Sequence, residues 1–74
     1  MGVVTRRGEE ALALARKAVH LAPTAPHYHL LAAICAENND RASAVDAMRR
    51  AVALEPGQAK YREFLEKLQE TPSR

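Results

Sequence analysis

A near-duplication 33 residues apart constrains the fold of this 74-residue chain more than any other feature. The segment RKAVHLAP at 16–23 returns as RRAVALEP at 49–56. The same offset places Tyr28 on Tyr61 and needs no gap anywhere in the overlap. A fixed period of this length is typical of repeat proteins, in which each unit is one supersecondary element that packs on the next. The sequence therefore predicts a stack of similar units.

Two kinds of helix, which we name A and B, alternate between the turns. The A helices carry apolar residues at positions i, i+3, i+4 and i+7, counted from Tyr28 and again from Tyr61. The B helices are rich in alanine and valine, and each ends at a proline, Pro23 or Pro56, which cannot continue a helix. We therefore expect an all-α fold. Its helices are predicted at 8–21 (B), 25–38 (A), 41–54 (B) and 58–70 (A).

Residues suited to helix ends occupy the turns. Thr24 is suited to cap the first A helix, with Pro26 in its first turn. Asn39 tolerates the left-handed conformation that closes a helix, and Asp40 is suited to cap the B helix that follows. Because this turn is only two or three residues long, the A and B helices that it joins must be adjacent and antiparallel.

Eight residues stand at the spacings of a known helical-repeat motif, in which large and small residues alternate on the first helix and alanines precede a closing proline on the second. They are Tyr28, Leu31, Ala32, Cys35, Ala44, Met48, Ala51 and Pro56. Through them the chain resembles the tetratricopeptide repeat family over about residues 8–70, as one full repeat flanked by two half repeats. The resemblance implies a short right-handed α-solenoid of antiparallel helix hairpins.

The length allows one small domain. We expect an N-terminal arm at 1–7, a single helical domain at 8–70 and a C-terminal tail at 71–74. Leu65 stands where the family usually has a small residue, which is acceptable because no B helix follows it. The last helix is polar on its other faces, as expected of the terminal cap that a solenoid needs.

The first B helix has no A helix in front of it. Its apolar stripe is therefore expected to be partly bare, since repeats stabilise one another by stacking. Three covers are compatible with the sequence: a second copy of the chain, part of a longer protein, or the N-terminal arm. The residues expected to form this exposed stripe are Leu12, Leu14, Ala15 and Val19.

The composition narrows the classes of partner. The 11 basic and 9 acidic residues give a net charge of +2 without a block of one sign, which favours neither a nucleic acid nor a membrane as partner. Cys35 is the only cysteine, so an intramolecular disulfide is excluded. The first thirty residues do not resemble a signal peptide, and no apolar run approaches the ~18 residues of a membrane span. We expect a cytoplasmic location.

The reactive side chains do not form a pattern typical of an enzyme active site. The residues His20, His27 and His29 lack the spacing and acidic neighbours of a metal site, so no metal and no cofactor are expected. Cys35 lies on the apolar stripe of its helix and is interpreted as a buried structural thiol. Arg16 and Arg50 belong to a basic strip on the B helices, interpreted as a solvated convex face.

Recognition of a protein or peptide is the remaining role. The resemblance implies a non-enzymatic interaction module, with a groove between the A helices that holds an extended or helical partner segment. Two alternatives stay open: an assembly element in which the unpaired first helix drives homo-oligomerisation, or a regulatory fragment of a longer enzyme. A further alternative is that the groove residues form only a solvated face and bind no partner. Carried over by position, the groove residues are His29, Ala33, Ala36, Arg62, Glu66 and Gln69.

Overall fold

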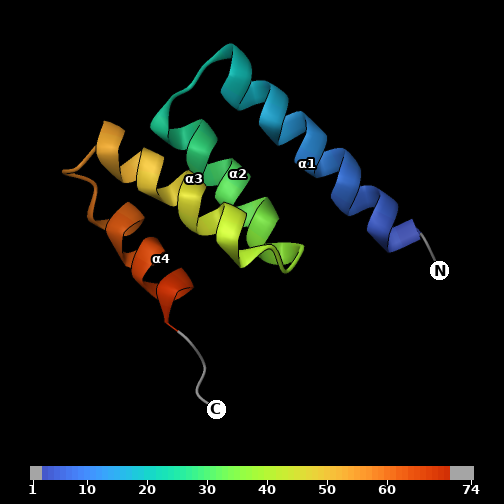
Figure 1. Cartoon of the computed structure of the whole chain (residues 1–74). Coiled ribbons are helices and arrows are strands. Elements are labelled where there is room, and N and C mark those ends of the chain that lie inside the picture. The colour runs from blue at the N-terminus through green and yellow to red at the C-terminus, as the bar shows by residue number, and fades with distance from the viewer. Residues whose placement is uncertain (1–2, 71–74) are drawn as a thin grey trace.

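The computed structural model describes residues 3–70, with side chains from residue 8 onwards, and consists of four helices (Figure 1). They are α1 (Val3–Leu21), α2 (Ala25–Glu37), α3 (Arg41–Leu54) and α4 (Ala59–Gln69). Successive helices run in opposite directions, and each packs mainly on its neighbours in the chain, so that α1 lies at one end of the row and α4 at the other. The expected all-α architecture of four helices is confirmed.

Helix α1 begins at Val3, five residues before the predicted start at residue 8. Periodicity did not indicate this extension, because the apolar pattern starts only at Ala11. No proline interrupts residues 3–10, and a single glycine in a helix costs only about 1 kcal/mol relative to alanine, so the helix continues through Gly8. Most of the expected N-terminal arm is therefore helical, whereas the expected tail at 71–74 lies outside the described residues.

Gly8 is also the point where α1 approaches the turn after α2. A Cβ added at Gly8 would lie 2.6 Å from the side-chain oxygen of Asn38. The side-chain amide of Asn38 donates a hydrogen bond to the carbonyl oxygen of Gly8 at 3.3 Å. The missing side chain therefore permits a contact between segments that are 30 residues apart.

The predicted turn chemistry is confirmed at both inner turns. The hydroxyl of Thr24 accepts a hydrogen bond from the backbone N–H of His27, which caps α2. Asn39 adopts a left-handed φ of 64°. The carboxylate of Asp40 accepts a hydrogen bond from the backbone N–H of Ser43 at 3.2 Å, which caps α3. These two caps fix where α2 and α3 begin.

The Asp40 cap makes stability depend on pH. Hydrogen bonds from Ser43 hold the pKa of Asp40 below its ordinary value of 3.8. The unfolded chain therefore binds the proton first, so the contribution is present above pH 3.8 and is lost as the pH falls through the lowered pKa of the folded state. We expect the wild-type protein to have a higher melting temperature than Asp40→Asn at neutral pH. This difference in melting temperature, the gap, should close in acid, because Asn also caps helices but does not titrate. Thermal melts of both proteins over this pH range measure the gap; a gap independent of pH would contradict the assignment.

The core is built mainly from small side chains. Ala32 on α2 and Ala44 and Ala51 on α3 are completely buried, which lets these two helices approach closely. Met48 and Cys35 are the largest fully buried side chains. The cluster continues onto α4 through two further buried residues, Tyr61 and Leu68. The core therefore lies between α2, α3 and α4, and α1 packs on it from one side through residues such as Leu12.

Candidate interaction surfaces

The two A helices meet through an aromatic contact. The ring of His29 on α2 lies 5.4 Å from the ring of Tyr61 and 5.4 Å from the ring of Phe64, both on α4, with centroids as the reference points. The ring of Phe64 meets it edge-on, at an interplanar angle of 76°. His29 was expected to line a groove; in the structure its ring forms part of the contact between the two A helices.

The other predicted groove residues divide between the two helices. Ala33 and Ala36 on α2 are half-buried and small, whereas Arg62, Glu66 and Gln69 on α4 are exposed and polar. The guanidinium of Arg62 donates a hydrogen bond to the carbonyl oxygen of Pro56, so it is held back toward the start of α4.

A cavity of about 200 Å³ lies where α2 ends and α3 begins, against the end of α4. Ala36, Asn39, Arg41 and Leu68 line it. Arg41 spans from α3 to α4, because its guanidinium donates to the carbonyl oxygen of Glu70 at 3.1 Å. The predicted groove residue Ala36 thus borders a concavity.

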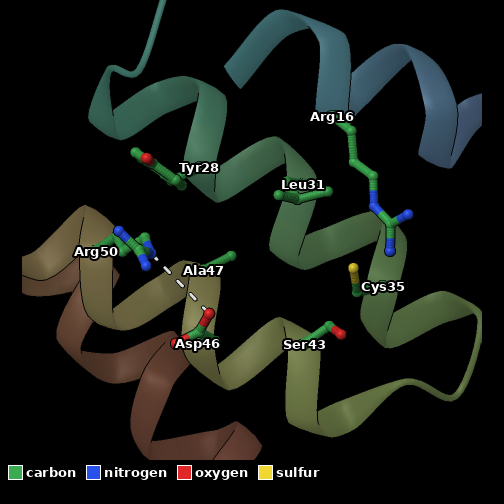
Figure 2. Close-up of a pocket in the computed structure, with 8 residues that line it drawn as sticks. All are labelled: Arg16, Tyr28, Leu31, Cys35, Ser43, Asp46, Ala47 and Arg50. Carbon is green, nitrogen blue, oxygen red and sulfur yellow. Dashed lines mark ion pairs between the residues drawn. The ribbon is translucent and has the colours of Figure 1, made fainter. Parts of the chain in front are cut away.

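A second cavity, of about 210 Å³, opens between the two B helices, and α2 contributes to its lining (Figure 2). Arg16 reaches into it from α1, while Asp46 and Arg50 border it from α3. The carboxylate of Asp46 lies 4.0 Å from Nε of Arg50, and both side chains are largely exposed. From the sequence alone, this strip is interpreted as a solvated face, because the concavity depends on how α1, α2 and α3 pack together.

Cys35 also borders this second cavity but is itself almost completely buried. Burial raises the pKa of its thiol, the charge of Asp40 raises it further, and Arg16 acts in the opposite direction. The thiol is therefore protonated at neutral pH and a poor nucleophile.

The stripe predicted on the first helix is wrong as one exposed surface. Ala15 is 1% exposed, Leu12 packs against the core and Val19 is half-buried, whereas Leu14 is 69% exposed. The physical reason is helical geometry. Residues two positions apart are separated by a rotation of about 200° around the helix axis, so Leu14 points away from Leu12. The surface that remains open carries Ala11, Leu14, Ala18 and Leu21, and we name it the outer face of α1.

The 33-residue offset shows that the outer face of α1 lacks the covering helix that the equivalent face of α3 has. Leu14 corresponds to Ala47 on α3, which is only 4% exposed because α2 covers that side of α3. Ala11 and Ala18 correspond likewise to the completely buried Ala44 and Ala51, yet both are half-exposed on α1. The duplication already indicates this open face when the two B helices are compared position by position, whereas the apolar spacing of the first helix alone does not.

The histidines do not gather into a metal centre. Within the described part of the chain, no three or more His, Cys, Asp or Glu side chains come together as metal ligands would. Nδ1 of His27 lies 2.7 Å from the carbonyl oxygen of Ala22. That oxygen can only accept, so the ring nitrogen donates and ties α2 to the turn before it.

Four helices, stacked in chain order over residues 3–70, define a small all-α fold. Between residues 3 and 70, no helix combines the length and the apolar character that crossing a membrane requires. No protein-family model, no curated protein and no solved structure matches this chain.

Proposed function

We propose that the chain is a non-enzymatic protein-interaction module of the tetratricopeptide type, which holds a peptide or helix of a partner between α2 and α4. The observation that carries the proposal is the cavity of about 200 Å³ bordered by the small, half-buried Ala36 of α2 and by Leu68 of α4, a helix whose predicted groove residues are exposed and polar. Small residues leave room for a partner's side chains, and polar residues fix its orientation.

The groove chemistry limits the partner. Arg62 and Glu66 lie one turn apart and carry opposite charges, so a segment with mixed charges suits the rim. Glu66 would repel a carboxylate, which argues against recognition of a partner's free C-terminus. The proposal includes a cytoplasmic setting, since a lone buried thiol is compatible with a reducing compartment.

A displayed library of short random peptides tests the groove. We expect enriched peptides to bind wild type, and the variant Arg62→Ala, Glu66→Ala to bind them at least about tenfold more weakly, as for the loss of a central polar anchor. The matched control is Asp46→Ala, Arg50→Ala, which also removes an exposed acid and base one turn apart, but on α3. Equal binding by the groove variant, or weakening by the control alone, would contradict the groove.

A second candidate function is assembly through the first helix, in which no separate ligand is needed. Leu14, at 69% exposure, is the observation that favours it. The role does not compete with the groove, because α1 lies at the opposite end of the row from α4.

A further inference from the structure

We propose that a second copy of this chain covers the outer face of α1, and that the two α1 helices pack antiparallel about a two-fold axis. This inference makes the assembly role specific and is independent of the groove. On this open surface Leu14 and Leu21 are 69% and 73% exposed, and Ala11 and Ala18 flank them on the same side. A helix with apolar residues on two faces is stable when both faces are covered.

Another repeat of the same design does not fit this face. The equivalent contact on α3 is made by the buried Ala44, Ala47 and Ala51, with Ala47 at the place of Leu14, whereas Leu54, at the place of Leu21, stays 51% exposed. An A helix that approached α1 as closely as α2 approaches α3 would overlap the leucine. The outer face therefore requires a partner that offers a small residue opposite Leu14.

A second α1 offers that residue. Ala11, Leu14, Ala18 and Leu21 follow one another at spacings of three, four and three residues, which is the pattern of positions a and d in a coiled-coil seam. In an antiparallel pair, position a of one helix lies opposite position d of the other. Leu14 then packs over Ala11 of the partner subunit, and the two-fold axis repeats the contact.

The charges beside this seam agree with the same register. Glu10 and Lys17 are exposed and lie seven residues apart on one flank of the outer face. With Leu14 over Ala11 of the partner subunit, Glu10 comes beside Lys17 of the partner subunit, and the symmetry makes this pair twice. In a parallel pair, the flank with Glu10 and Lys17 would instead lie beside the opposite flank of the partner subunit's α1. That flank carries Ala15, which is buried under α2.

Head-to-tail stacking through α4 is less favourable. The residues that correspond to the buried Ala25 and Ala32 of α2 are the exposed Gln58, which precedes α4 as its N-cap residue, and the bulky Leu65 on α4. A B helix from another copy would have to bury the first and would be held off by the second. The open end at α1 is therefore self-complementary rather than complementary to α4.

Sedimentation equilibrium at low salt over a range of protein concentrations tests the pairing. We expect wild type to exchange between monomer and dimer, and Leu14→Glu to stay monomeric, with a dissociation constant raised at least about 100-fold because two charges would enter the seam. The matched control Leu54→Glu changes a leucine of similar exposure on α3 and should leave the constant within about twofold.

Charge reversal tests the orientation. Glu10→Lys and Lys17→Glu should each weaken the dimer about tenfold, because two attractive pairs become repulsive. The double variant restores both pairs and should return the constant to within about twofold of wild type. Circular dichroism confirms that each variant is folded. A wild type that stays monomeric, a double variant as weak as the single ones, or open-ended oligomers would each overturn the proposal.

Discussion

Met48→Ala is expected to remove much of the free energy of unfolding. Met48 is completely buried in the cluster that joins α2, α3 and α4, and such truncations cost about 2–5 kcal/mol because a cavity remains. A domain of this size holds only about 5–10 kcal/mol in total. Urea unfolding followed by far-UV circular dichroism should therefore show a midpoint lowered by a large fraction, with the variant partly unfolded at moderate temperature.

The control for this prediction is Met48→Leu, which keeps nearly the same volume and should cost less than about 1.5 kcal/mol. If Met48→Ala were no less stable than Met48→Leu, the site would not be close-packed, and the contact of α3 with both A helices would need a different basis.

Ala32→Leu is expected to have the second large effect. Ala32 is completely buried at the close approach of α2 and α3, where no space exists for three further carbon atoms. Overpacking at such a site costs about 1–3 kcal/mol and forces the two helices apart. The free energy of unfolding from a urea titration measures the loss.

The chain contains its own control for this change, because Leu65 occupies the equivalent position on α4 and is only half-buried. Leu65→Ala should cost about 1 kcal/mol, as expected for a partly buried side chain with one open side. Equal losses at both positions would mean that the two A helices do not differ in this respect, and the interpretation of Leu65 as lying on an open side of α4 would fail.

The helices and their turns were predictable because their signals are local. Periodicity, two prolines, an Asn that takes a left-handed conformation and an Asp cap are all written within a few residues of the boundary that they set. The start of α1 was not predictable in this way, because the stretch before Ala11 has no apolar period.

The candidate sites were harder, because they depend on how helices approach one another. Spacing along the chain does not set the contact of His29 with two aromatic rings of α4. Nor does it set the hydrogen bond that the Arg62 guanidinium donates to the carbonyl oxygen of Pro56. The outer face of α1 was missed for a different reason. Leu14 was assigned to the stripe of Leu12 by its proximity in sequence, although helical rotation separates the two.

The central claim is that α1 is a B helix with one face left open for a second copy. Residue-resolved amide hydrogen exchange at low and at high protein concentration tests it most directly, because exchange reports the local opening of each helix. We predict that protection of α1 amides rises with concentration more than protection of α3, which already has helices on both sides. Protection of α1 that is independent of concentration, and equal to that of α3, would contradict the claim.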